Sequence, residues 1–234
     1  MPDPRSPLSP LPEVIAHRGA NREAPESSLA AFEAAIELGA GGIELDVQMT
    51  ADGIPVVHHD PRLPLAGRTG QGPAIAILTL DDLRRLSPVA TLDEVVDSVG
   101  GRCRLYVEIK AAPALLAVLR SIRHLGDGCA VHAFDHRVIS RAAEVAPEVP
   151  RGILLVSRLV DPLAAMEAVR ARDLWQQVDL IDADLVERVH AAGRRVIAWT
   201  ANDAARAREL IALGVDGLCT DALREIRSLV DGHG

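Results

Sequence analysis

Lysine and aromatic residues are scarce in this 234-residue sequence. Lys110 is the only lysine among 25 basic residues, and aromatic side chains make up 2% of the chain. Acidic residues outnumber basic ones, 33 to 25, and no basic run could follow a nucleic-acid backbone. We therefore expect no nucleic-acid partner. A compact ammonium can contact a carboxylate or a phosphate oxygen where a planar guanidinium does not fit, so Lys110 is a candidate site residue.

Long apolar runs are also absent. No segment approaches the ~18 consecutive apolar residues of a membrane-spanning helix, and the start lacks the apolar core of a signal peptide. These absences predict a cytoplasmic protein without stable membrane insertion. The cysteines, Cys103, Cys129 and Cys219, are odd in number and far apart, which favours reduced core thiols over disulfides or a zinc site. The oligomeric state stays open.

The rest of the chain alternates short apolar runs typical of β-strands with Ala- and Leu-rich stretches of helical period. After a proline-rich lead at residues 1–12, this alternation predicts one domain over residues 13–234, an α/β protein with a single (β/α)8 TIM barrel. Neither GxGxxG nor GxxxxGK[ST] is present, which disfavours a doubly wound nucleotide-binding sheet. The predicted strands cover residues 14–16, 42–49, 54–58, 104–109, 130–134, 152–156, 178–181, 196–200 and 217–219. The predicted helices cover residues 28–38, 114–125, 136–145, 162–171, 184–191 and 203–213.

One connection is too short for a parallel crossover. Residues 50–53 separate two predicted strands, and Asp52-Gly53 is a strong two-residue hairpin signal. With these two as the turn residues, Asp46 lies opposite His59, and His58 points to the other face. The sequence therefore predicts a short hairpin around Asp52-Gly53 that brings His59, rather than His58, to Asp46.

Carboxylates stand near the ends of two predicted strands. Glu44 and Asp46 share one face of their strand and repel each other unless a cation lies between them. Because the carboxyl ends of barrel strands meet at one mouth, Glu108 from a later strand joins them there. These three residues predict an all-oxygen site for a divalent cation, Mg²⁺ or Ca²⁺. A solvated strand face is the alternative for any such pair taken alone.

Histidines and cations occupy the ends of the same group of strands. His17 and Arg18 follow the first strand, His59 follows the hairpin, and Lys110 shares a face with Glu108. A metal surrounded by two histidines and two cations is typical of chemistry at phosphoryl oxygens, in which the cations spread the developing charge and the histidines move protons.

Smaller expectations concern residues without a charged partner nearby in sequence. Phe134 and Trp199 end strands, so either can line a pocket or pack in the core. Tyr106 and Trp175 are expected to be structural. The remaining histidines, His132 among them, have no carboxylate at suggestive spacing and are expected at the surface or at helix ends.

The motifs resemble those of the glycerophosphodiester phosphodiesterase family in order and spacing. The matching segments are residues 15–19 (IAHRG), 24–32 (APESSLAAF), 42–47 (GIELDV), 55–60 (PVVHHD), 107–110 (VEIK), 133–136 (AFDH), 198–202 (AWTAN) and 214–221 (GVDGLCTD). They extend from about residue 14 to residue 221. Two departures stand out: the family usually has Asn where this chain has Ser27, and often has Ser where it has Ala133, which we expect to remove a polar contact near the mouth.

The resemblance implies a TIM barrel similar to that of phosphatidylinositol phospholipases C. It also implies metal-dependent hydrolysis of glycerophosphodiesters to glycerol 3-phosphate and an alcohol, through a cyclic phosphate. The implied residues are His17 and His59 for acid/base catalysis, Glu44, Asp46 and Glu108 for the metal, and Arg18, Lys110, Glu26, Phe134 and Trp199 for the phosphate or the rest of the substrate. The implied partner is a small-molecule glycerophosphodiester.

Three alternatives stay open. The same barrel could act on lysophospholipids as a lysophospholipase D, which would call for an apolar rim at the mouth. A barrel aldolase or isomerase could use Lys110 as a nucleophile, although Glu108 on the same face favours a charged lysine. A barrel without catalysis could keep the pocket for a phosphate ligand.

Overall fold

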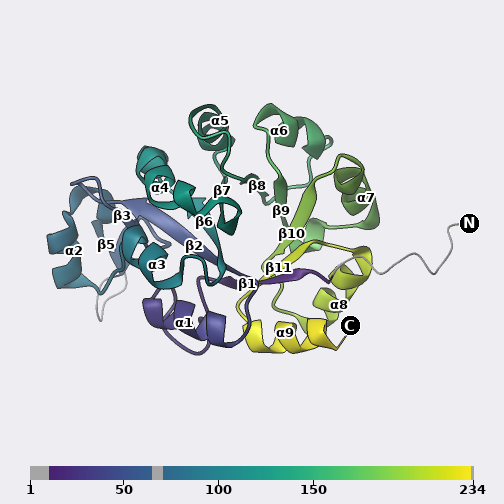
Figure 1. Ribbon diagram of the computed structural model, residues 1–234, viewed down its shortest axis with the longest axis horizontal. Coiled ribbons are helices and arrows are strands. Elements are labelled where there is room, and N and C mark those ends of the chain that lie inside the picture. The colour runs from purple at the N-terminus through teal and green to yellow at the C-terminus, as the bar shows by residue number, and fades with distance from the viewer. Residues whose placement is uncertain (1–10, 65–70, 233–234) are drawn as a thin grey trace, which may run out of the picture.

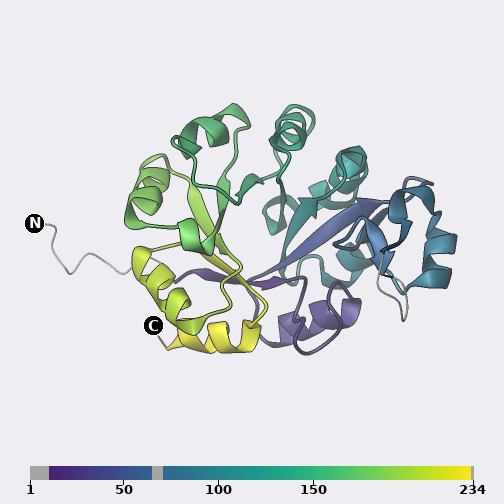
Figure 2. The same ribbon diagram turned by 180° about the vertical axis from the view of Figure 1, so that it is seen from behind.

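Eight parallel strands close into a barrel in the computed structural model, which describes residues 11–64 and 71–232. The pairing of β1 with β2 completes the ring. Helices surround it, as Figure 1 and Figure 2 show from opposite sides, and the predicted (β/α)8 fold is confirmed. The barrel strands are β1 (Glu13–His17), β2 (Gly42–Met49), β6 (Arg104–Ile109), β7 (Cys129–Ala133), β8 (Arg151–Leu155), β9 (Asp173–Gln177), β10 (Arg195–Trp199) and β11 (Gly217–Thr220). Most of the predicted lead, 1–12, lies outside the described residues.

The helices begin and end at residues suited to those positions. Asp203 accepts a hydrogen bond from the backbone N–H of Arg206 at the start of α8, and Gly214 ends that helix at a left-handed φ of 83°. Ser28 caps α1 in the same way as Asp203 caps α8. The helices are α1 (Leu29–Glu37), α2 (Leu80–Leu86), α3 (Leu92–Val99), α4 (Leu115–Ile122), α5 (His136–Val145), α6 (Pro162–Ala168), α7 (Ala183–Ala191), α8 (Ala204–Leu213) and α9 (Leu223–Asp231). Among the described residues, no helix has the length and apolar character needed to cross a membrane.

The strand predicted at residues 178–181 is wrong. Val178–Leu180 form a short 3-10 helix, η4, and the barrel strand there is Asp173–Gln177. Polar residues hide this strand in the sequence, because partners from distant parts of the fold help to satisfy them. Asp173 is buried beside its sequence neighbour Arg172 and beside Arg195 of β10, and the side-chain amide of Gln176 donates to backbone oxygens at the end of β8. A local apolar pattern could not show these distant partners.

The hairpin exists, but its predicted register is wrong by one residue. β3 (Pro55–Val57) runs antiparallel to β2 and pairs Val47 with Val57, so His58, not His59, lies next to Asp46. The loop has three residues, because Thr50 and Ile54 bond to each other across it and Gly53 takes a positive φ of 80°. A three-residue loop that ends in a left-handed glycine shifts the pairing by one position.

Two further strands and three further 3-10 helices complete the described elements. They are β4 (Arg62–Pro64) and β5 (Gln71–Ala74), which pair with each other, and η1 (Ile75–Ile77), η2 (Ala112–Ala114) and η3 (Arg123–Gly128). They lie outside the barrel wall and leave its ring of strands uninterrupted.

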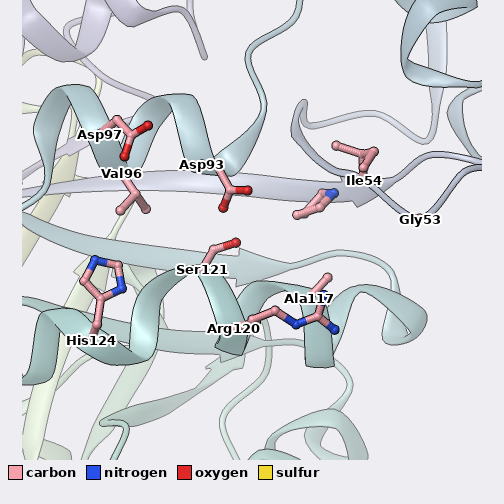
Figure 3. A pocket seen from close by; sticks show the side chains of 10 residues that line it. Gly53, Ile54, Asp93, Val96, Asp97, Ala117, Arg120, Ser121 and His124 are labelled. Atoms are coloured by element: carbon pink, nitrogen blue, oxygen red, sulfur yellow. The ribbon is translucent and has the colours of Figure 1, made fainter.

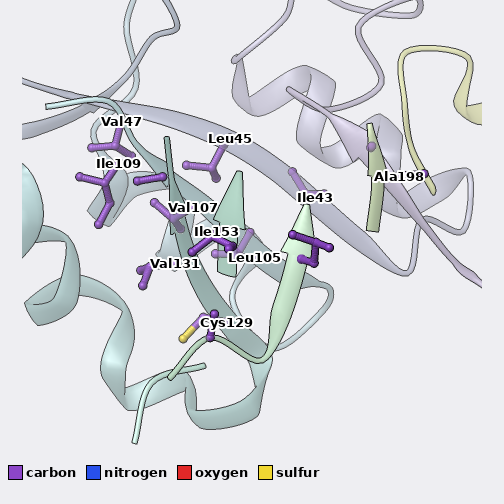
Figure 4. Close-up of a cluster of buried hydrophobic side chains, with 14 of the residues drawn as sticks. Ile43, Leu45, Val47, Leu105, Val107, Ile109, Cys129, Val131, Ile153 and Ala198 are labelled. Carbon is purple, nitrogen blue, oxygen red and sulfur yellow. The ribbon is translucent and has the colours of Figure 1, made fainter. Parts of the chain in front are cut away.

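Side chains alternate along each barrel strand between two apolar cores. One face packs against the helices, where Figure 4 shows Ile43 and Leu45 of β2 beside Leu105 and Val107 of β6. The other face fills the middle of the barrel with a smaller cluster: Ile15, Tyr106, Ala130, Leu154, Trp175, Ile197 and Cys219. This inner cluster divides the charged residues inside the barrel into a group at the floor, where the strands begin, and a group at the mouth, where they end.

Candidate active site

A cavity of about 210 Å³ opens at the mouth of the barrel. Its lining includes eight residues predicted for the site: His17, Arg18, Glu44, His59, Glu108, Lys110, Phe134 and Trp199. The two other predicted residues reach the lining through Arg18. Asp46 Oδ2 lies 3.1 Å from Arg18 Nε, and Glu26 Oε1 lies 3.2 Å from Arg18 Nη1. The fold thus gathers all ten residues from separate parts of the chain.

Three carboxylates are buried at this mouth. Glu44, Asp46 and Glu108 are 3%, 1% and 7% exposed, and the parallel register pairs Asp46 with Glu108. Burial and the charge of Asp46 raise the pKa of Glu44 to about 7. Burial, assisted by the charge of Glu44, also raises the pKa of Glu108 to about 7. The ionised forms of these two carboxyls are therefore poorly compensated.

Two cations contact the carboxylates. Lys110 Nζ lies 3.1 Å from Asp46 Oδ1 and 2.8 Å from Glu108 Oε1. Arg18 lies in the left-handed region at φ 56°, and its backbone N–H donates to Glu44 Oε2 at 3.3 Å. Burial would raise the pKa of Asp46, but Lys110 and Arg18 outweigh it and hold that pKa below its ordinary value. The cations therefore favour an ionised Asp46 more than an ionised Glu44 or Glu108.

His17 is oriented by a carboxylate that the sequence interpretation missed. Its Nδ1 lies 2.7 Å from Asp221 Oδ1, which leaves Nε2 on the side of Glu44, 3.9 Å from Oε2. The amides of Asn21 and Asn202 both donate to Asp221 and hold it in place. Burial lowers the pKa of His17, but the Asp221 hydrogen bond and the nearby charge of Glu44 outweigh burial and raise it. Asp221 closes one of the matching motifs, but 204 residues separate it from its partner.

His59 reaches the cavity and His58 does not line it. His59 Nδ1 lies 2.7 Å from Asp60 Oδ1, and its backbone oxygen accepts from the side-chain amide of Gln48. His58 Nδ1 lies 2.8 Å from the backbone oxygen of Asp60. Since β3 ends at Val57, both histidines belong to a loop, and the direction of the loop, not strand alternation, decides which one lines the cavity.

His132 contradicts the expectation of a surface or helix-end residue. It is 1% exposed, lies in β7 directly beside Glu108 of β6, and stacks on Trp175 with ring centroids 4.2 Å apart. Its Nε2 is 3.8 Å from Glu44 Oε1. Burial lowers the pKa of His132 to about 4, so the ring is neutral at pH 7. The parallel pairing of β6 and β7 creates this neighbourhood, and no local spacing shows it.

Phe134 and Trp199 form one side of the mouth. Their rings meet edge to face with centroids 5.5 Å apart, and Lys110 Nζ lies 5.8 Å from the Phe134 centroid. Phe134 is 44% exposed, whereas Trp199 is half-buried. Both aromatic rings line the cavity.

Comparison with known proteins shows the family of this chain. A model of the glycerophosphoryl diester phosphodiesterase family matches residues 17–225. The chain belongs to this family. A glycerophosphodiester phosphodiesterase of Caldanaerobacter subterraneus subsp. tengcongensis is 31% identical over 238 residues, which cover 93% of this chain and 97% of the relative. The resemblance is thus confirmed, together with the prediction of an enzyme, a phosphoric diester hydrolase.

Solved structures of family proteins have the same fold. A putative glycerophosphoryl diester phosphodiesterase from Silicibacter pomeroyi has a TM-score of 0.87 at 25% identity and covers 95% of this chain and 94% of its own. A phosphodiesterase from Oleispira antarctica, solved in complex with the product sn-glycerol-3-phosphate, has a TM-score of 0.85 at 27% identity, with coverages of 94% and 97%. Family structures therefore superpose on nearly the whole barrel.

The carboxylates at the barrel mouth of this chain fit a divalent cation. Glu44 and Glu108 are buried and poorly compensated, and hard cations prefer carboxylate oxygens. One oxygen of each, with one ring nitrogen of His132, lie within 4.8 Å of one another. Asp46 is buried beside them, although Arg18 and Lys110 engage its oxygens. The donor set is therefore suited to a cation that adds the positive charge which Lys110 alone does not supply to Glu44 and Glu108.

The two departures from the family pattern have different consequences. Ala133 is fully buried among the side chains that face the helices, so the expectation that it removes a polar contact near the mouth is wrong; its neighbour His132 faces the cavity instead. Ser27 takes a left-handed φ of 58°, and its Oγ has no hydrogen-bond partner among the described residues. Asn tolerates this backbone conformation better than Ser, which explains the usual family residue.

A second hollow lies outside the barrel and is larger, about 350 Å³. Figure 3 shows Asp93 and Asp97 on α3 across from Ser121 and Arg120 on α4. None of the ten predicted site residues lines this hollow. Volume alone therefore does not identify the active site, and the buried charges at the mouth do.

Proposed function

We propose that this phosphodiesterase hydrolyses water-soluble glycerophosphodiesters, such as glycerophosphocholine, to glycerol 3-phosphate and an alcohol, with a divalent cation and two histidines. The observation that carries this proposal is the buried cluster of Glu44, Asp46 and Glu108 at a cavity that His17 and His59 also line. The product named for the Oleispira antarctica relative supports the choice of a small glycerol phosphate ester.

Glu44, Asp46 and Glu108 would hold the cation, Mg²⁺ or Ca²⁺. A bound divalent cation supplies positive charge to a phosphoryl oxygen and lowers the pKa of a coordinated hydroxyl. The carboxylates must be ionised to bind it, which costs free energy in the metal-free protein because burial opposes their charge.

His17 would take the proton from the glycerol 2-hydroxyl. Asp221 holds Nδ1 and stabilises the imidazolium, which leaves Nε2 free to accept the proton. The hydroxyl oxygen then attacks phosphorus and forms a five-membered cyclic phosphate. His59, which also lines the cavity, would give a proton to the oxygen of the leaving alcohol. Water opens the cyclic phosphate as the histidines exchange these roles.

Arg18 and Lys110 would contact the phosphate. Both side chains line the cavity, and both are already held by carboxylates, so they are preorganised before substrate binds. Glu26 would hold the Arg18 guanidinium in position through Nη1. Phe134 and Trp199 would enclose the glycerol or the leaving alcohol.

One observation favours a second candidate, hydrolysis of lysophospholipids. Exposed apolar side chains stand beside the mouth: Phe134 follows β7, and Val156 and Val160, 61% and 97% exposed, follow the neighbouring strand β8. Such side chains can contact an acyl chain. The aldolase alternative is weakened, because Asp46 and Glu108 outweigh the effect of burial and raise the pKa of Lys110, which favours the non-nucleophilic ammonium.

The test is the release of glycerol 3-phosphate from glycerophosphocholine by purified protein, first with EDTA and then with Mg²⁺ or Ca²⁺ restored. We expect release that stops with EDTA and returns with metal. Lysophosphatidylcholine is assayed in parallel, and faster release of choline from it would favour the second candidate. No release from either substrate by folded protein with either metal would contradict the hydrolase and leave a phosphate-binding role.

A further inference from the structure

His132 is a buried base that the proposed mechanism does not use. Its ring is 1% exposed and stacks on Trp175 at an interplanar angle of 12°. Trp175 is itself part of the core that fills the barrel, so the imidazole is held in one plane. A buried polar ring with a fixed orientation costs free energy unless its nitrogens have partners.

Hydrogen bonds do not account for this ring. Among the described residues, Nδ1 of His132 has no hydrogen-bond partner. Nε2 lies 3.8 Å from Glu44 Oε1, which is too long for a hydrogen bond. Two atoms that each lie about 2.1 Å from one ion are separated by roughly 3 to 4 Å, so the observed spacing suits two ligands of the same cation.

The neighbours of His132 complete a compact set of ligand atoms. One nitrogen of His132 and one oxygen each of Glu44 and Glu108 lie within 4.8 Å of one another, and all three side chains are buried. Glu108 is the direct partner of His132 in the parallel register of β6 and β7. Asp46 has both oxygens beside cations, since Lys110 and Arg18 each lie 3.1 Å from it.

We infer that His132 is a nitrogen ligand of the cation held by Glu44 and Glu108, so that this chain's metal site is a mixed nitrogen and oxygen site. The inference rests on the proposed metal site and adds a specificity to it. Neutral imidazole binds first-row transition ions well, whereas Ca²⁺ and Mg²⁺ prefer sets made of oxygen alone. The site therefore favours Mn²⁺, Co²⁺ or Zn²⁺ over Ca²⁺.

The test uses Mn²⁺ as the probe on the metal-free full chain. Electron spin echo envelope modulation of bound Mn²⁺ detects a directly bound nitrogen through its ¹⁴N coupling. We expect ¹⁴N modulation in the wild type, its replacement by a ¹⁵N pattern when histidine is ¹⁵N-labelled, and its loss in His132→Gln. By equilibrium dialysis, His132→Gln should weaken Mn²⁺ binding by at least about 10-fold, and Ca²⁺ binding much less.

Three variants control for other histidines. His17→Gln and His59→Gln remove the other imidazoles that line the cavity, and His124→Gln removes one on the outer hollow; all three should keep the ¹⁴N modulation. Modulation that is absent in Mn²⁺-loaded wild type, lost in His17→Gln or His59→Gln, or kept in His132→Gln would overturn the inference while leaving the metal site intact. If dialysis shows no cation bound at all, the proposed metal site fails with it. Should His132→Gln not fold, the ¹⁵N-labelled wild-type spectrum together with the spectra of His17→Gln and His59→Gln still decides, because these two are the other histidines of the cavity lining.

Discussion

The two ends of the barrel interior solve the problem of buried charge in opposite ways. At the floor, the carboxylate of Glu13 accepts hydrogen bonds from Arg104, Arg195 and Tyr106 at 3.0, 2.9 and 2.6 Å. Asp173 is fully buried there and pairs with two arginines, Arg172 and Arg195. Every carboxylate of this group has a cation within reach.

At the mouth, cations and carboxylates do not balance. Two cations serve three carboxylates: Asp46 contacts Lys110 and Arg18, and Glu108 shares Lys110. Burial still raises the pKa values of Glu44 and Glu108 to about 7. A cluster left incomplete among apolar strands indicates a missing ligand, and a completed cluster indicates a structural role. Whether buried carboxylates are fully compensated by cations therefore separates functional clusters from structural ones better than the mere presence of buried charge does.

The largest expected effect is the loss of turnover when a mouth histidine is exchanged. His17→Asn or His59→Asn should lower kcat about 10³-fold, because general acid/base catalysis contributes on the order of 10² to 10⁴. Thermal unfolding should change little, since neither residue packs in the core. Steady-state release of glycerol 3-phosphate measures the effect. His58→Asn is the matched control and should keep its turnover. A comparable loss of turnover in this variant would contradict the choice of His59 as the catalytic histidine of the loop.

A substitution at the floor should lower stability and leave turnover unchanged. Glu13→Gln leaves Arg104 and Arg195 facing each other without their shared carboxylate, which should lower the free energy of unfolding by about 2 to 4 kcal/mol. Turnover by the protein that remains folded should equal that of the wild type. Urea unfolding and an assay well below the midpoint measure both quantities. Loss of turnover without loss of stability would contradict the division between floor and mouth.

Removing a mouth carboxylate should stabilise the metal-free protein. The pKa of Glu44 rises from 4.5 to about 7 on folding, so its contribution to stability is present below pH 4.5 and lost as pH rises through 7. Glu44→Gln should therefore raise the free energy of unfolding at pH 8 in EDTA, on the order of 1 to 3 kcal/mol, and have no such effect at pH 4.5. Glu108→Gln should give a smaller gain, because it also removes the carboxylate that lies 2.8 Å from Lys110 Nζ.

Asp46 provides the control of opposite sign. Its pKa is held below the ordinary value by Lys110 and Arg18, despite burial, so its contribution is present at pH 8 and lost as pH falls. Asp46→Asn should therefore destabilise the metal-free protein at pH 8. The same urea titrations compare the variants. If Asp46→Asn and Glu44→Gln change the free energy of unfolding in the same direction, the proposed excess of buried negative charge at the mouth is wrong.

Much of this arrangement was predictable because it follows from short segments. Alternation along β2 puts Glu44 and Asp46 on one face, and the rule that strand ends meet at the barrel mouth adds Glu108. The helix predicted at residues 203–213 also agrees with α8, because local capping by Asp203 and Gly214 sets its limits. Local chemistry thus determines which residues face the mouth.

Partners brought together by distant strands were not predictable in the same way. Asp221 reaches His17 across 204 residues, and His132 reaches Glu108 through the pairing of β6 with β7. The hairpin register that favoured His59 over His58 is wrong. His59 does line the cavity, but for a different reason than the predicted register. Periodicity gives the face of a strand but not its neighbour in space.

The smallest expected effect concerns backbone conformation at the mouth. Ser27 holds a φ of 58°, which Asn adopts at lower cost, so Ser27→Asn should raise the free energy of unfolding by about 0.5 to 1 kcal/mol. Arg170, at φ 52° after α6 on the floor side, is the matched position, and Arg170→Gly should give a similar gain. Urea unfolding measures both. If Ser27→Asn gains stability but loses turnover while Arg170→Gly loses none, the strained loop beside Glu26 and Arg18 belongs to the catalytic mouth rather than to the scaffold.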